Sequence, residues 1–205
     1  MADSCVWTPM PAEFIHVSEP GTGTPLLLLH GTGADETQLL GLGRLLAPGA
    51  PLLSPRGKVL ENGMLRYFRR LAEGVFDQED LHARALELAA WVDANADEPP
   101  LAVGFSNGAN IASAMLLLSP HTLSGALLIR PMVPFEPDPL PDLRGKRVLL
   151  LSGRADGMVA PGQPEQLAGL LRRAGAQVEL SWQNAGHELG AGDVAEARAW
   201  LQGKT

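Results

Sequence analysis

Residues 101–108 read Leu-Ala-Val-Gly-Phe-Ser-Asn-Gly, an apolar run that ends in the pattern G-x-S-x-G around Ser106. Residues 107–118 are nearly all apolar or small, so they predict a buried helix directly after the run. A serine on a sharp strand-to-helix turn presents its hydroxyl outward, and the glycines leave room for the bend. The stretch therefore predicts that Ser106 is a nucleophile, at a helix N-terminus that favours developing negative charge. The simpler interpretation is a glycine-rich turn whose serine caps the helix.

Apolar runs and helical patterns alternate along the rest of the chain. The expected strands cover residues 14–17, 26–29, 51–53, 101–105, 126–129, 147–151 and 178–182. The expected helices cover residues 79–95, 107–118, 163–174 and 194–201. This alternation predicts an α/β fold with a mostly parallel central sheet and helices on both faces. We place 14–17 at an antiparallel edge, and 178–182, which alternates apolar with polar residues, toward a sheet edge.

We expect residues 1–205 to form one domain, because no repeat or linker interrupts the pattern. The segment 131–141 contains five prolines and reads as a rigid loop over the sheet edge. It lies between Arg130 and Lys146, a separation too short for a cap domain.

Composition is that of a globular chain, with 45% hydrophobic residues and a net charge of −7. The negative charge disfavours nucleic acid and anionic membranes as partners. No apolar run reaches the length of about 20 residues that a membrane span needs. The single cysteine, Cys5, excludes a disulfide framework and a thiolate metal cluster, and no secretory signal is recognisable, so we expect a cytoplasmic protein. A homodimer stays open, since dimers are the commonest assembly of soluble enzymes.

Five histidines compete to be the base that activates the serine. His187 follows the last predicted strand and precedes the last helix, which is where a parallel sheet places its site. His30 closes the strand 26–29, and we assign it a structural role. The others, His16, His82 and His121, fall on a strand, a helix and a turn, and we interpret them as surface or boundary residues. His187 is therefore the predicted base.

A carboxylate must orient the imidazole, and Asp156 is the candidate. It follows the strand 147–151, precedes a helix and lies between glycines. The chain order of serine, aspartate and histidine is the one that this strand-turn-helix motif uses. The alternative interpretation is that Asp156 forms a turn or caps a helix, which aspartates often do.

Two N–H groups must stabilise the oxyanion of an acyl-transfer reaction. One belongs to the residue after the nucleophile, Asn107, and the other to the loop after residues 26–29. Within His-Gly-Thr-Gly at 30–33, Thr32 is the first choice and Gly31 the second, and the sequence leaves both open. A phosphate-binding loop is a weaker interpretation, because no Lys-Ser/Thr follows.

These segments resemble the phospholipase/carboxylesterase family of α/β-hydrolases, which includes acyl-protein thioesterases and bacterial carboxylesterases without a cap domain. The resemblance extends from about Leu26 to Leu201, and the stretches 54–64 and 69–77 are similar to a bacterial carboxylesterase subgroup linked to hydroquinone stress. It implies an α/β-hydrolase fold without a cap, and serine-esterase chemistry on small carboxylic esters or thioesters with no metal and no organic cofactor.

The substrate pocket is only sketched by the sequence. Arg56 and Arg130 follow predicted strands, so either could bind a carboxylate or a phenolic oxygen, although a surface arginine is an equal alternative. Met158 could line an apolar wall. The leading hypothesis is a serine hydrolase of small carboxylic esters that forms an acyl-enzyme. The alternatives are a thioesterase or lactonase with the same triad, or a non-catalytic protein that binds a small ligand.

Overall fold

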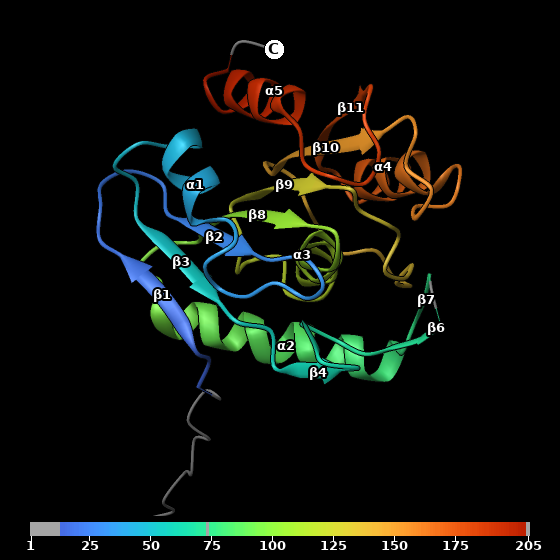
Figure 1. Ribbon diagram of the computed structural model, residues 1–205, viewed down its shortest axis with the longest axis horizontal. Helices are drawn as coiled ribbons and strands as arrows, with labels where there is room; N and C mark the ends of the chain where they lie inside the picture. The colour runs from blue at the N-terminus through green and yellow to red at the C-terminus, as the bar shows by residue number, and fades with distance from the viewer. Residues whose placement is uncertain (1–12, 73, 204–205) are drawn as a thin grey trace, which may run out of the picture.

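A seven-stranded sheet forms the centre of the protein in the computed structural model, which describes residues 13–203 except residue 73. Cys5 and the N-terminal segment considered above lie outside the described residues. The strands are β1 (His16–Glu19), β2 (Leu26–Leu29), β3 (Leu52–Pro55), β8 (Leu101–Phe105), β9 (Gly125–Ile129), β10 (Arg147–Gly153) and β11 (Gln177–Gln183). Their order in the sheet is β1-β3-β2-β8-β9-β10-β11, and all neighbours are parallel except β1 and β3. The mostly parallel sheet is therefore confirmed, with β1 as the antiparallel edge (Figure 1).

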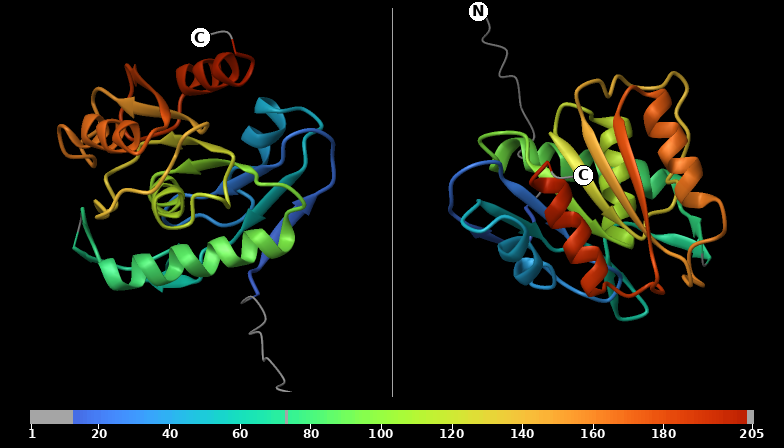
Figure 2. Two further views of the ribbon diagram at one scale, coloured as in Figure 1. Left: turned by 180° about the vertical axis from the view of Figure 1, so that it is seen from behind. Right: turned by 90° about the horizontal axis from the view of Figure 1, so that it is seen from above.

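Helices cover both faces of this sheet, as predicted (Figures 1 and 2). They are α1 (Leu40–Leu46), α2 (Gln78–Asn95), α3 (Asn107–Leu118), α4 (Gln163–Arg173) and α5 (Ala191–Leu201). One face packs against α2, α3 and α4, and the other against α1 and α5. Among the described residues, no helix is both long enough and apolar enough to cross a membrane.

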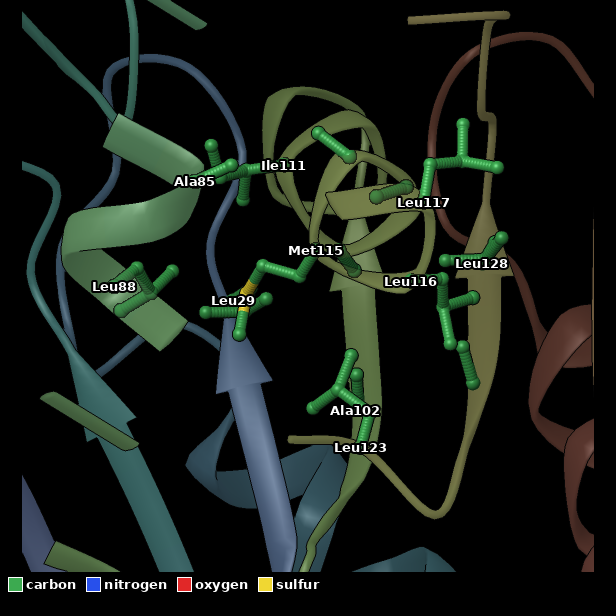
Figure 3. Packing of buried hydrophobic residues seen from close by; sticks show 14 of the residues in the cluster. Leu29, Ala85, Leu88, Ala102, Ile111, Met115, Leu116, Leu117, Leu123 and Leu128 are labelled. Atoms are coloured by element: carbon green, nitrogen blue, oxygen red, sulfur yellow. The ribbon is translucent and has the colours of Figure 1, made fainter. Parts of the chain in front are cut away.

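The four leucines of β2 show why the sequences of the central strands are uninterrupted apolar runs. Leu27 and Leu29 pack toward α2 and α3, whereas Leu26 and Leu28 join the core under α1 and α5. Figure 3 shows Leu29 between Leu88 of α2 and Met115 of α3. Because successive side chains of a strand point to opposite faces, a strand covered on both sides needs apolar residues at every position.

Helix α1 was missed by the sequence analysis. Its sequence, Leu-Gly-Leu-Gly-Arg-Leu-Leu, contains two glycines, which lower the propensity for a helix. A Cβ at Gly43 would lie 2.9 Å from a methyl group of Leu28, so a small residue lets the helix approach the sheet. Helix α5 begins at Ala191, three residues before the predicted start at 194.

Two short hairpins between β3 and α2 were also missed. They are β4 (Val59–Glu61) with β5 (Met64–Arg66), and β6 (Arg70–Ala72) with β7 (Val75–Phe76). The first turns at Asn62-Gly63, where both residues have positive φ. Asn-Gly is the strongest local signal for such a hairpin, so the pairing of β4 with β5 was predictable from the sequence.

The strand order fixes where a site can form. The chain leaves β2 toward β3 on one side, whereas β8 lies on the other side of β2. The loops at the carboxyl ends of β2 and β8 therefore diverge, and such a divergence is where open α/β sheets bind ligands. Residues 131–146, after β9, contain no helix or strand, which agrees with the absence of a cap that the family resemblance implied.

Candidate active site

Ser106 occupies a strained turn between β8 and α3. Its backbone angles are φ 53° and ψ −111°, a conformation that residues with a side chain rarely adopt. A Cβ at Gly108 would lie 1.9 Å from the carbonyl oxygen of Leu29, so the approach of α3 to β2 requires glycine there. The Ser106 hydroxyl makes no capping hydrogen bond to the described part of α3. The turn therefore does not use its serine as a helix cap.

The structure brings Ser106, His187 and Asp156 together from three loops. The Nε2 atom of His187 lies 2.8 Å from Ser106 Oγ, and its Nδ1 atom lies 2.9 Å from Asp156 Oδ2. An ionised carboxylate only accepts hydrogen bonds, so Nδ1 carries the proton and Nε2 is left to accept from the serine hydroxyl. This is the tautomer in which a histidine can take a proton from serine.

Asp156 is itself fixed by the loop after β10. Its other carboxylate oxygen, Oδ1, accepts hydrogen bonds from the backbone N–H groups of Met158 and Val159, at 2.8 and 3.2 Å. The side chain is only 3% exposed. Asp156 therefore has both of the roles proposed for it. Oδ1 stabilises a turn, and Oδ2 faces the imidazole of His187.

Arg130 holds the loop that carries His187. Its Nε donates to the carbonyl of Gly186 at 2.8 Å and its Nη2 to that of Glu188 at 2.9 Å, on either side of the histidine. Two further bonds reach both carboxylate oxygens of Asp193 in α5, and another reaches Leu151. All five N–H donors of the guanidinium are therefore used within the protein.

The structure consequently contradicts the interpretation of Arg130 as a ligand for substrate. It is 1% exposed, and its full set of donors leaves none for a ligand. Arg130 borders the cavity beside Ser106, whereas Arg56 does not. The Nε and Nη2 atoms of Arg56 both donate to the carboxylate of Glu36, and Nη2 lies 2.6 Å from Oε1. Of the three predicted substrate ligands, Met158 alone lies in the cavity wall with an exposed side chain.

The loop after β2 offers one candidate for the second oxyanion donor. The N–H of Gly31 donates to Gln38 Oε1 at 2.8 Å, and that of Gly33 donates to the carbonyl of Leu65. The N–H of Thr32 makes no hydrogen bond within the described residues. Asn107 is the first residue of α3, so its N–H has no carbonyl in the preceding turn of the helix. Thr32 and Asn107 are thus the candidates, and Gly31 is not.

His30 is buried and structural in this arrangement. Its Nε2 accepts the N–H of Gly57 at 2.9 Å, so Nδ1 carries the proton and donates to the carbonyl of Gly31 at 2.8 Å. Burial lowers the pKa of His30 below its ordinary value of 6.5. A protonated ring would direct an N–H at the Gly57 N–H, which adds to the cost of charging it.

This lowered pKa predicts a loss of stability in acid. Below pH 6.5 the unfolded chain binds a proton on His30 that the folded chain does not, so the free energy of unfolding falls as the pH drops toward the folded pKa. Above pH 6.5 this contribution is complete. The variant His30→Gln keeps an acceptor for Gly57, and we expect a weaker dependence of stability on pH between pH 6.5 and the folded pKa, measured by urea unfolding. An unchanged slope in His30→Gln would contradict the explanation.

A small cavity of about 50 Å³ opens to solvent beside Ser106 and His187. Its wall includes the predicted residues Thr32 and Asn107 together with Arg66 and Arg70, which the sequence analysis did not single out. Arg66 ends β5 and Arg70 begins β6. The Asn-Gly turn could have placed Arg66 on a hairpin strand. No local pattern reveals that this hairpin folds back over the loop after β2.

The central sheet is mostly parallel, and the loops at the carboxyl ends of its strands bring together a serine, a histidine and an aspartate that are linked by hydrogen bonds. This combination defines an α/β-hydrolase. The chain is 45% identical over 194 residues to the protein named Putative hydrolase MhqD of Bacillus subtilis (strain 168). The matched region covers 91% of this chain and 97% of that protein. The crystal structure of the Bacillus cereus carboxylesterase is 43% identical, with a TM-score of 0.91 over 95% of this chain and 96% of that chain. A structure of YahD with malic acid is 31% identical, with a TM-score of 0.88 over 94% of this chain and 100% of that chain.

No family model matches the chain. The identities and coverage of the relatives nevertheless show that it belongs to the phospholipase/carboxylesterase family of α/β-hydrolases, and like them it is a hydrolase. The family resemblance read from the sequence is thereby confirmed.

Proposed function

We propose that this hydrolase cleaves short carboxylic esters through Ser106, His187 and Asp156. The observation that carries the proposal is the continuous series of hydrogen bonds from serine to imidazole to carboxylate, at 2.8 and 2.9 Å. The 43% identity to a carboxylesterase supports the ester as substrate class. A non-catalytic binding protein would need no such series.

The proposed reaction proceeds in two halves. Ser106 Oγ attacks the ester carbonyl carbon while its proton passes to His187 Nε2, and the N–H groups of Thr32 and Asn107 stabilise the oxyanion. The C–O bond to the alcohol then breaks, the alcohol leaves with the proton from His187, and the acyl group stays on Ser106. Water repeats the sequence, which releases the carboxylic acid and restores the serine.

Short acyl groups fit this site best. The cavity is small and open, and residues 131–146 form no cap over it. The relative that was solved with malic acid, a four-carbon dicarboxylic acid, agrees with small acids as products. A thioester or lactone would react at the same three residues, so comparing rates on an acyl-CoA, a lactone and an aryl ester distinguishes these substrates. The cytoplasmic location and the homodimer stay predictions from the sequence.

A fluorophosphonate probe tests the proposal, because it reacts with a serine only where the base and the oxyanion donors activate it. We expect one covalent adduct per chain, assigned to Ser106 by mass spectrometry of peptides, together with hydrolysis of a short aryl ester by the same preparation. Heat-denatured protein is the control and should not react. Refusal of the native protein to react would favour the non-catalytic binding protein, and an adduct on another residue would overturn the assignment of the nucleophile.

A further inference from the structure

Arg66 and Arg70 lie in the wall of the cavity that contains Ser106, together with the fully paired Arg130. Arg66 has a side chain that is 5% exposed, and its Nη1 donates to the Thr32 hydroxyl at 2.9 Å. Arg70 is 26% exposed and begins the β6–β7 hairpin. This hairpin lies on the side of the sheet toward which β8, β9 and β10 point, the side that carries the triad loops (Figure 1). Both positive charges therefore border the reaction centre.

The positive charge of this pair is only partly balanced within the described residues. One carboxylate, Glu61, serves both arginines: it accepts from Arg70 Nε at 2.9 Å, and it lies 3.5 Å from Arg66 Nε. None of the described residues that line the cavity is a carboxylate. Burial lowers the pKa of Arg66, the neighbouring charge of Arg70 lowers it further, and Glu61 opposes both effects. The site thus favours one more negative charge, in a chain whose net charge is −7.

The hydrogen-bond donors of Arg66 and Arg70 also favour an anionic ligand. Arg130, a purely structural arginine, uses all five N–H donors within the protein. Arg66 donates two hydrogen bonds within the described residues, to Thr32 and to the carbonyl of Phe68. The guanidinium of Arg70 donates one hydrogen bond within the described residues, from Nε to Glu61. Arg130 also lines this cavity in a structural role, but Arg66 and Arg70 differ from it because some of their N–H donors meet no acceptor among the described residues.

We propose that Arg66 and Arg70 bind a free carboxylate in the acyl part of the substrate, so that the preferred substrates are half-esters of short dicarboxylic acids. The proposal rests on the proposed function, because it assigns a substrate class to that site. The alcohol takes its proton from His187 and therefore leaves on the histidine side. Arg66 contacts Thr32, beside the oxyanion donors, and we assign its charge to the acyl part because the alcohol leaves toward His187. Planar guanidinium groups match the two oxygens of a carboxylate.

Two pairs of esters of equal shape test this substrate class in the parent protein. Monomethyl succinate and methyl isocaproate differ in having a carboxylate or an isopropyl group at the end of the acyl chain. Acetylglycolate and isobutyl acetate differ in the same way on the alcohol side. We expect kcat/KM, followed by proton release, to favour monomethyl succinate over methyl isocaproate by about tenfold to hundredfold, the effect of charge-assisted hydrogen bonds. Equal rates within the acyl pair, or a preference confined to the alcohol pair, would overturn the proposal.

Arg70→Gln tests the residue itself, because Arg70 is partly exposed and its loss leaves Glu61 beside Arg66. We expect the preference within the acyl pair to fall by about tenfold, mainly through a higher KM for monomethyl succinate. Arg70→Lys should keep part of it. The matched control is Arg69→Gln, which removes the same charge from an exposed neighbour that pairs with Asp77 and does not line the cavity.

The outcomes distinguish a failure of the carboxylate site from a failure of the proposed function. If Arg69→Gln lowers the preference as much as Arg70→Gln, the effect belongs to the overall charge and the carboxylate site is refuted. If methyl isocaproate is hydrolysed and monomethyl succinate is no better, the proposed function stands without this substrate class. If the parent hydrolyses neither ester and does not react with the fluorophosphonate, the proposed function itself fails.

Discussion

The variant Ser106→Ala is expected to hydrolyse short esters with a kcat about 10⁵- to 10⁶-fold below that of the parent. Without the Oγ atom no acyl-enzyme forms, and His187 and Asp156 have no nucleophile to activate. The remaining activity would come from binding and from the oxyanion donors acting on water. The measurement is kcat on an aryl ester at saturating substrate, with enough enzyme to detect the residual rate. Activity within tenfold of the parent would refute Ser106 as the nucleophile.

The same variant should remain folded. Ser106 directly follows β8, and among the described residues its side chain makes one hydrogen bond, to a histidine that is 21% exposed. A matched control is Ser113→Ala in α3, which removes a fully buried hydroxyl that donates to the carbonyl of Ala109. We expect that variant to keep its esterase activity. A loss of activity in both variants would indicate damage to α3 rather than loss of a nucleophile.

The candidate triad could be located from sequence because each member carries a local signal. Ser106 follows a buried run within a glycine pattern, and Asp156 and His187 each follow a predicted strand. In a parallel sheet the carboxyl ends of the strands share one edge, so residues in these loops are brought together whatever their separation along the chain. For these three residues, position after a strand together with the chain order was sufficient to predict that the side chains meet, although not how they are held.

The partners of the arginines could not be predicted in this way. Arg56 and Arg130 also follow strands, yet Glu36 and Asp193 bind their guanidinium groups. Arg56 lies outside the cavity wall, and Arg130 has no donor left for a ligand. An arginine reaches several ångströms along a flexible side chain, so its environment depends on distant segments that local periodicity does not describe. Arg66 was missed for the same reason.

Arg130→Met is expected to lower the free energy of unfolding by about 3–5 kcal/mol, because it leaves the carboxylate of Asp193 buried without its counter-charge. Both side chains of this pair are at most 1% exposed. The carbonyls of Gly186 and Glu188 would also lose their donor, so the loop between them would hold His187 less firmly. Urea unfolding measures the stability, and kcat on a short ester under conditions where the variant is folded measures the second effect.

A double variant separates these two roles of Arg130. In Arg130→Met with Asp193→Asn, neither charge is left unpaired, and the amide oxygen can still accept the N–H of Gly190 as the carboxylate does. Much of the lost stability should therefore return, since removing a whole buried ion pair costs far less than removing one partner. The activity should stay low, because no donor reaches the carbonyls on either side of His187. Should the double variant recover parental kcat, Arg130 would act only as the counter-charge of Asp193, and the position of the imidazole would have to be maintained by Asp156 and Ser106 alone.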